Sequence, residues 1–232
     1  MKIRVPYETA EERGVVLELE VPDANLTNQF LPKEPAAVPD LARAVENAID
    51  KPVAGLGFRE AVKKGNKVVL VVENQFRAAP VDGVLPLLIK RIRDAGAEVR
   101  IVIANGKVPA LSQEEIARRV GKQVIDTGIA ITCNDASNPD RYSFVGVTTA
   151  GTPLWILKEV READVVITIS TTQATLWGYG GSGMVIPGVA SNETIETNHV
   201  MALAPDCRPG NNECRLQQDK YEALRMAGIR MG

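Results

Sequence analysis

The sequence has little of the two residue types on which most metal and disulfide chemistry depends. Among 232 residues there is one histidine, His199, and there are three cysteines, Cys133, Cys207 and Cys214. An odd number of cysteines without a CxxC pair argues against a disulfide framework and against a structural zinc site. Imidazole chemistry can run only through His199, which excludes metal sites built from two histidines and acid–base pairs of two imidazoles.

An excess of charge and long apolar runs are also missing. Lys and Arg number 27 and Asp and Glu 29, so the formal net charge is −2, and the basic residues are spread along the chain. This balance argues against a nucleic-acid partner. No apolar run approaches the roughly 18 residues that a membrane span needs, and the start, MKIRVPYE, lacks the apolar segment of a signal peptide. We therefore expect a cytoplasmic protein with no nucleic-acid or membrane partner.

The remaining composition is that of a folded chain with two parts. Hydrophobic residues make up 45% and charged residues 24% of the sequence, which excludes a disordered chain. Alternating segments at 2–6 and 15–21 are typical of strands that pair as a ribbon, and several prolines follow them. We expect an N-terminal β ribbon with a proline-rich arm over residues 1–36 and an α/β domain over residues 37–232.

Strands and helices are predicted to alternate through that domain. The apolar, β-branched run at residues 67–72 is typical of a parallel strand buried on both faces, a further strand is predicted at 99–104, and residues 164–169 predict another buried strand. Helical spacing follows the first two of these strands, over 81–95 and 112–120. Thr152-Pro153 has the form of an N-cap followed by proline, which predicts a helix from there to Ala163. The pattern predicts a doubly wound, mainly parallel α/β sheet of the Rossmann type, with ligands bound where strands end and helices begin.

The first candidate binding loop, from Glu73 to Pro80, follows a predicted buried strand. Its Arg77 carries a guanidinium fork suited to a carboxylate or a phosphate. Unpaired N–H groups at the start of the next helix also favour an anion. The alternative is that Arg77 is a solvated loop residue and Asn74 a turn former.

The second candidate loop is rich in glycine and reads Trp177-Gly-Tyr-Gly-Gly-Ser-Gly183. Its backbone allows a ligand to approach closely, and successive N–H groups can form an anion-binding nest. It matches neither the Walker A pattern nor GxGxxG. The alternative is a flexible connection, although a loop of this length in a compact domain is more often functional.

Taken together, these segments resemble the N-terminal domain of the nickel-pincer-dependent lactate racemase family of 2-hydroxyacid racemases and epimerases. The resemblance runs from about residue 53 onward and rests on the Arg77 loop, 101–104, GVTTAGTP at 146–153, 163–164, the glycine loop, IPGVA at 186–190, ETI at 193–195 and Asn198-His199. It implies hydride transfer from the substrate to a nucleotide-derived nickel pincer that is tethered to a lysine. It also implies two proton-transfer histidines, a nickel-ligating histidine and an arginine that holds the substrate carboxylate.

The match to the family's functional residues is partial. His199 falls at the nickel-ligating histidine, and Arg77 falls at the carboxylate-binding arginine. Val108 and Gln173 stand at the two proton-transfer histidines, and Gly183 stands at the tethering lysine. Neither valine nor glutamine can act as a base near pH 7, and glycine cannot carry a covalent cofactor. The family's C-terminal domain has no counterpart here, so we expect a fragment, a truncated form, or a separate partner that supplies that domain.

These assignments define a candidate site and leave three functions open. The site is predicted to contain catalytic Arg77 and Gln173, cofactor-binding Asn74, Gly180, Gly181, Ser182 and Gly183, and metal-binding His199. The first function is a divergent or impaired racemase that binds a 2-hydroxyacid and a nucleotide-derived nickel cofactor. The second is a non-catalytic module that binds a nucleotide or carboxylate, or regulates, on the same fold. The third is another chemistry in the same cleft, with polar candidates Asn134, Asp135, Gln173, Tyr179 and Ser182.

Overall fold

The computed structural model describes the chain apart from residues 7–14, 29, 31–35, 78 and 230–232 and the side chain of Ser182. Its centre is a parallel sheet of β3 (Lys67–Glu73), β4 (Glu98–Ala104), β5 (Ile131–Cys133) and β8 (Val165–Ile169), in the order β5-β4-β3-β8. The first three strands follow one another outward, and β8 returns to the other side of β3, as in a doubly wound sheet. The predicted fold class is therefore confirmed.

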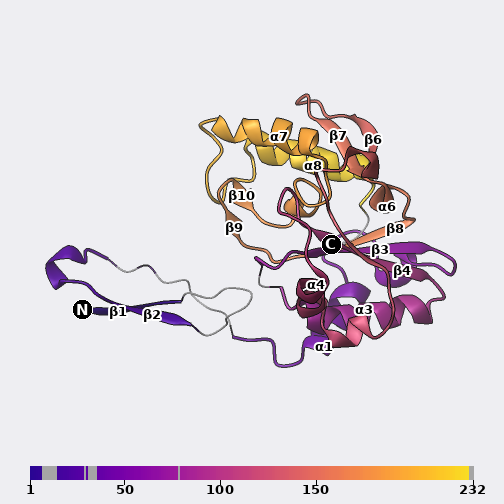
Figure 1. Ribbon diagram of the computed structural model, residues 1–232, viewed down its shortest axis with the longest axis horizontal. Helices are drawn as coiled ribbons and strands as arrows, with labels where there is room; N and C mark the ends of the chain where they lie inside the picture. The colour runs from indigo at the N-terminus through magenta and orange to yellow at the C-terminus, as the bar shows by residue number, and fades with distance from the viewer. Residues whose placement is uncertain (7–14, 29, 31–35, 78, 230–232) are drawn as a thin grey trace.

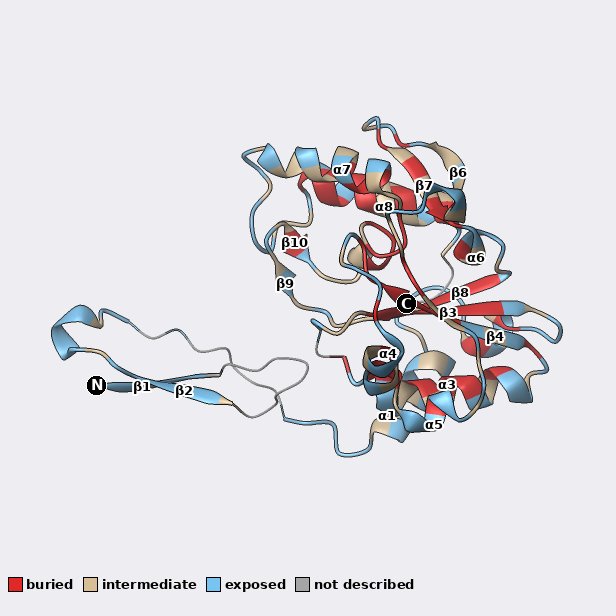
Figure 2. Cartoon of the chain, viewed as in Figure 1, coloured by how far each residue is buried: buried red, intermediate tan, exposed pale blue. Residues whose placement is uncertain are grey.

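Each face of the sheet supports its own apolar core, because successive strand residues point to opposite faces. Val68, Leu70 and Val72 belong to one core and Val69 and Val71 to the other. The first core is covered by α1 (Leu41–Asp50), α2 (Phe58–Ala61), α3 (Val81–Asp94), α4 (Gln113–Val120) and α5 (Lys122–Ile125). The second is covered by β6 (Tyr142–Val147), β7 (Pro153–Leu157), α6 (Lys158–Arg161), α7 (Asn192–Val200) and α8 (Arg215–Ala227). Figure 2 shows the buried residues gathered along the sheet and the inner sides of these two layers.

The N-terminal ribbon extends away from the α/β body (Figure 1). Strand β1 (Lys2–Pro6) pairs antiparallel with β2 (Val16–Glu20), and every residue of β2 is exposed. The predicted ribbon is thus present, whereas much of the predicted proline-rich arm, residues 31–35, lies outside the described part of the chain. Within the described residues, no helix has both the length and the apolar character needed to cross a membrane.

The segment after Thr152 is a strand, so the predicted helix from there to Ala163 is wrong. Strand β7 pairs antiparallel with β6, and helical structure is confined to the four residues of α6. Leu154 and Ile156 are fully buried on one face of β7, an alternation that suits a strand. The Thr152 hydroxyl donates a hydrogen bond to Asp219 (2.8 Å), and Thr152 does not cap a helix. Strand pairing and burial override the local Thr-Pro signal here.

Short elements complete the chain between these strands and helices. They are η1 (Asp23–Asn25), η2 (Pro139–Arg141), β9 (Ala174–Thr175), β10 (Gly178–Tyr179), η3 (Ser182–Met184) and η4 (Met201–Leu203). Strands β9 and β10 form a small hairpin that contains part of the glycine-rich segment. This segment is therefore a folded structure rather than a simple flexible connection.

Candidate functional site

A cavity of about 720 Å³ opens at the carboxyl ends of β3, β4 and β8. Strands β3 and β8 are neighbours, and the strand order reverses between them, which is where doubly wound sheets bind ligands. The loops after the strands, the glycine-rich segment and helices α7 and α8 all contribute to its wall. Its volume falls in the range of roughly 300–1,000 Å³ that is usual for small-molecule sites.

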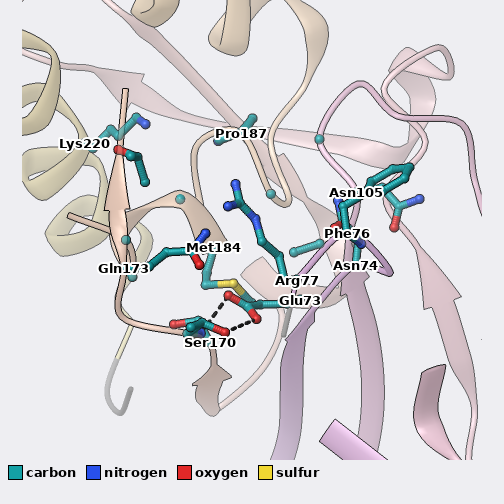
Figure 3. A pocket seen from close by; sticks show the side chains of 18 of the residues that line it. Glu73, Asn74, Phe76, Arg77, Asn105, Ser170, Gln173, Met184, Pro187 and Lys220 are labelled. Carbon is teal, nitrogen blue, oxygen red and sulfur yellow. Dashed lines mark hydrogen bonds between the residues drawn. The ribbon is translucent and has the colours of Figure 1, made fainter. Parts of the chain in front are cut away.

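The cavity brings together the predicted site residues from distant parts of the sequence (Figure 3). Its wall includes Asn74, Arg77, Gln173, Gly180, Gly181, Gly183 and His199. The side chain of Ser182 lies outside the described residues. Val108, at the position of a proton-transfer histidine in the resemblance, also lines the cavity. The placement agrees with one shared site, and the role assigned to each residue stays a prediction.

Arg119 holds the backbone of the Arg77 loop. Its buried side chain donates hydrogen bonds to the carbonyl oxygens of Glu73 (2.9 Å), Arg77 (3.3 Å) and Ala79 (3.2 Å). Asn74 also shapes the loop, because its side-chain oxygen accepts a hydrogen bond from the N–H two residues on (3.1 Å). The turn-forming role considered for Asn74 is therefore present, and the guanidinium of Arg77 is left exposed at the cavity.

Glu73 joins the ends of the two strands at the point where the strand order reverses. Its carboxylate accepts hydrogen bonds from the backbone N–H (2.7 Å) and the hydroxyl (2.8 Å) of Thr171, which follows β8. One carboxylate oxygen also lies 4.0 Å from Nη2 of Arg119. Glu73 is the only acidic residue among the described residues that line the cavity. Its charge is thus already compensated within the protein.

Glycine is required at some positions of the glycine-rich segment and not at others. A Cβ atom at Gly178 would lie 2.6 Å from the side-chain oxygen of Asn212, and at Gly180 it would lie 2.9 Å from the carbonyl oxygen of Thr171. At Gly183, in contrast, a Cβ atom would meet nothing within 4 Å. A longer side chain would therefore have room at position 183, where the sequence supplies none.

His199 and Lys220 line the cavity beside the indole of Trp177. The His199 and Trp177 rings meet edge to face, with centroids 5.2 Å apart, and Nζ of Lys220 lies 5.9 Å from the Trp177 centroid. Burial, followed by the nearby Lys220 ammonium, lowers the pKa of His199 to about 4. Burial lowers the pKa of Lys220 to about 8. At pH 7 the imidazole is therefore neutral and the ammonium is mostly charged.

The single histidine allows a direct test of this environment. In a proton NMR titration, the one histidine ring is expected to titrate with a midpoint of about 4, well below the ordinary value of about 6.5. Because the folded-state pKa is the lower one, His199 also makes the fold lose stability as the pH falls from 6.5 towards 4. In Lys220→Met the midpoint should rise, since a neighbouring positive charge is removed. A midpoint near 6.5 in the folded wild type would contradict the described burial.

Two residues considered for another chemistry do not reach the cavity. Asn134 is fully buried, donates to two backbone carbonyls (2.9 and 3.2 Å) and accepts from the hydroxyl of Tyr142 (3.0 Å). Asp135 lies outside the cavity wall and bonds to Ser137 (2.5 Å). Both residues stabilise the local structure, so the prediction that they belong to the cavity is wrong. Gln173 and Tyr179 do line the cavity.

The sequence model of the lactate racemase N-terminal domain matches residues 14–209. The chain belongs to this family. The lactate racemase of Lactiplantibacillus plantarum is 26% identical over 173 residues, which are 72% of this chain and 41% of that protein. The lactate racemase of Thermoanaerobacterium thermosaccharolyticum is 25% identical over 159 residues, 67% of this chain and 37% of that protein. The chain thus matches about two fifths of the length of these curated relatives, and the resemblance inferred from the motifs is confirmed.

Solved structures agree with the family assignment at the level of the fold. The lactate racemase apoprotein of T. thermosaccharolyticum superposes with a TM-score of 0.84 and 22% identity, over 99% of this chain and 54% of that chain. A protein from Thermotoga maritima superposes with a TM-score of 0.68 and 20% identity, over 85% of this chain and 49% of that chain. The family's α/β architecture is therefore conserved in this chain.

The residues at the cavity do not fit a cofactor held covalently by lysine at the family's position. Gly183 provides no amine, although the space for one exists. His199 provides a neutral imidazole whose Nδ1 makes no hydrogen bond with the described residues. In the described part of the chain, no three His, Cys, Asp or Glu side chains are grouped so that they could hold a metal ion. Among the described residues, the imidazole of His199 is therefore the only predicted nickel ligand.

The site also contains residues that the sequence did not single out. Arg119 and Glu73 position the loop and the strand ends, and Lys220 adds a buried cation. A sequence signal exists for Lys220, because it falls in the buried stripe of α8, four residues after Leu216 and three before Ala223. A charged residue in an apolar helical stripe is a sign of a buried functional or structural role.

Proposed function

We propose that this lactate racemase-family domain binds a small organic anion in the cavity, a 2-hydroxyacid carboxylate or a nucleotide phosphate, and does not racemise it. One observation carries the proposal: the cavity retains Arg77, while Val108, Gln173 and Gly183 stand where the resemblance places proton transfer and the tether. Valine and glutamine cannot take up and return a proton near pH 7. The binding chemistry is thus retained and the racemase chemistry is not.

The charges around the cavity support an anionic ligand. Glu73 is compensated by Thr171 and Arg119, and Lys107 is paired with Glu196 at 2.6 Å. The guanidinium of Arg77 has neither an ion pair nor a hydrogen bond to the described residues and lies at the cavity surface. A free guanidinium fork suits a carboxylate or a phosphate group, which it can bind through two parallel hydrogen bonds.

The test is calorimetric titration of the wild type and Arg77→Ala with lactate and with AMP. The wild type is expected to bind at least one of them, and Arg77→Ala should weaken that binding about 10- to 100-fold, the effect of losing a charge-assisted hydrogen bond. Arg161→Ala removes an arginine from α6, away from the cavity, and serves as the matched control. Equal affinity in Arg77→Ala and the wild type would remove Arg77 from the site, and no binding of either probe would reject the proposal.

Family membership and His199 favour a second candidate, residual racemase activity with a nickel-containing nucleotide cofactor. A pKa of about 4 leaves the imidazole neutral at pH 7 and able to ligate a metal. The test is to produce the chain alongside the cofactor-making enzymes, measure nickel by elemental analysis, and follow the lactate isomers by chiral chromatography. Bound nickel with interconversion of the isomers would favour this candidate, and mass spectrometry would show whether any lysine carries an adduct.

A further inference from the structure

Lys220 is a second cationic side chain in the cavity, and it is far more buried than Arg77. It is 6% exposed and lines the cavity from α8 (Figure 3). Its ammonium makes no hydrogen bond and no ion pair with any described residue. It lies over the face of the Trp177 ring, 5.9 Å from the ring centroid. A cation–π contact contributes much less favourable free energy than the burial of an unpaired ammonium costs.

The nearby carboxylates do not compensate this charge by contact. Asp219, the preceding residue, is buried and accepts hydrogen bonds from Thr148, Thr152 and Asn198 instead. Glu73, the acid of the cavity wall, is held by Thr171. The described residues therefore supply no anionic partner to the Lys220 ammonium, which faces the cavity and is open to an anionic ligand there.

The surroundings of Lys220 favour a phosphate as that partner. Trp177, over which the ammonium lies, is the first residue of the glycine-rich segment, and Gly180 and Gly181 line the same cavity. The N–H of Gly180 already donates to the carbonyl oxygen of Gln173 (2.7 Å), whereas the N–H of Gly181 makes no hydrogen bond with the described residues. Lysine beside a free backbone N–H of a glycine-rich segment is a common combination for binding phosphate. In Figure 3 Lys220 lies at the left of the cavity, and the guanidinium of Arg77 projects into the cavity from the side of Asn74. The two cations thus come from different walls and can hold different groups of one molecule.

We propose that Lys220 forms a second anion subsite, distinct from Arg77, so that the cavity takes a 2-hydroxyacid that also carries a phosphate. The inference rests on the proposed function of the first subsite and assigns the carboxylate, of the two groups considered there, to Arg77. It narrows the ligand class from any small anion to a molecule with two anionic groups. A cavity of about 720 Å³ has room for both groups.

The experiment is calorimetric titration at pH 7.0 with three probes: lactate, inorganic phosphate and 3-phosphoglycerate, a 2-hydroxyacid with a phosphate on its third carbon. The wild type is expected to bind 3-phosphoglycerate at least about tenfold more tightly than lactate. Lys220→Met should lower the affinity for 3-phosphoglycerate about 10- to 100-fold and leave that for lactate within about twofold. Lys90→Met, which removes an exposed lysine paired with Asp94 on α3, is the control and should change neither affinity.

The outcomes separate this proposal from the one on which it rests. Unchanged affinity for 3-phosphoglycerate in Lys220→Met, or equal affinity of the wild type for lactate and 3-phosphoglycerate, would overturn the second subsite while leaving the first in place. Binding of phosphate alone, lost in Lys220→Met, would support the subsite. No binding of any probe would overturn both proposals. Lys220→Gln, with a thermal melt of each variant, separates a lost ligand contact from a lost fold.

Discussion

Replacing Asp219 with alanine is expected to lower the free energy of unfolding by about 3–5 kcal/mol. The carboxylate is 2% exposed and accepts hydrogen bonds from the hydroxyls of Thr148 and Thr152 and from the amide of Asn198 (2.8 Å for Thr152 and 2.7 Å for Asn198). Alanine would leave these donors unpaired in the interior, which costs more than the hydrogen bonds contribute when made. Urea unfolding followed by circular dichroism measures the difference.

Two further variants test whether burial of the three donors is the cause. Asp219→Asn keeps the shape and one acceptor oxygen, so it should lose less stability than Asp219→Ala. Glu222 lies on the same helix and accepts hydrogen bonds from the N–H (2.9 Å) and the hydroxyl (2.6 Å) of Thr149, but these are exposed. Glu222→Ala should therefore cost much less, because water replaces its contacts. Equal losses in Asp219→Ala and Glu222→Ala would contradict this account.

Asp219 and its three donors, Thr148, Thr152 and Asn198, form a buried cluster that connects elements of the site. It joins α8 to α7 and to the turn between β6 and β7. Asn198 directly precedes His199, and Asp219 directly precedes Lys220. The cluster therefore fixes the relative positions of the two helices that carry the imidazole and the ammonium of the cavity. Its loss is expected to disturb ligand binding as well as stability.

Much of the sheet was predictable, because its strands have a strong local pattern. After their first residue, the runs at 67–72 and 164–169 are mostly apolar and β-branched, and such runs have few stable positions other than the centre of a sheet. The helix predicted after Thr152 failed for the opposite reason. Thr152-Pro153 is a favourable local signal for the start of a helix. The strand forms instead because β7 pairs with β6, an interaction that the sequence of β7 alone does not reveal.

Part of the candidate site was also predictable from the sequence, and part was not. Arg77 and the glycine-rich segment were predictable, because loops at the carboxyl ends of parallel strands meet at one edge of the sheet. The support for them was not, because Arg119 reaches the Arg77 loop from 42 positions away in sequence. Lys220 lies in α8, a helix that the candidate site predicted from the sequence does not include. Its place at the cavity follows from packing of α8 beside the glycine-rich segment, which periodicity alone does not define.

Replacing Lys220 with methionine is expected to raise the free energy of unfolding at pH 7 by about 2–3 kcal/mol. The pKa of Lys220 is lowered from 10.5 to about 8 by burial, a difference worth roughly 3 kcal/mol at 1.36 kcal/mol per unit, from which the lost contact with Trp177 subtracts up to about 1 kcal/mol. Methionine fills a similar volume without a charge.

The stability difference is also expected to depend on pH. Between pH 8 and 10.5 the unfolded wild type binds more protons than the folded form, so the stability of the wild type rises with pH in that window. The advantage of Lys220→Met should therefore shrink above pH 8 and vanish near pH 10.5, as measured by urea unfolding at pH 7.0, 9.0 and 10.0.

Comparing the wild type with Lys220→Met also links the stability of the fold to ligand binding. Lys90→Met, at an exposed ion pair, is expected to show no comparable change with pH. A difference between wild type and Lys220→Met that stays constant from pH 7.0 to 10.0, or a less stable Lys220→Met at pH 7.0, would mean that the ammonium is already compensated inside the protein. If Lys220→Met is instead more stable and binds 3-phosphoglycerate less well, the wild type retains a charge that destabilises the fold in exchange for ligand recognition, as functional sites often do.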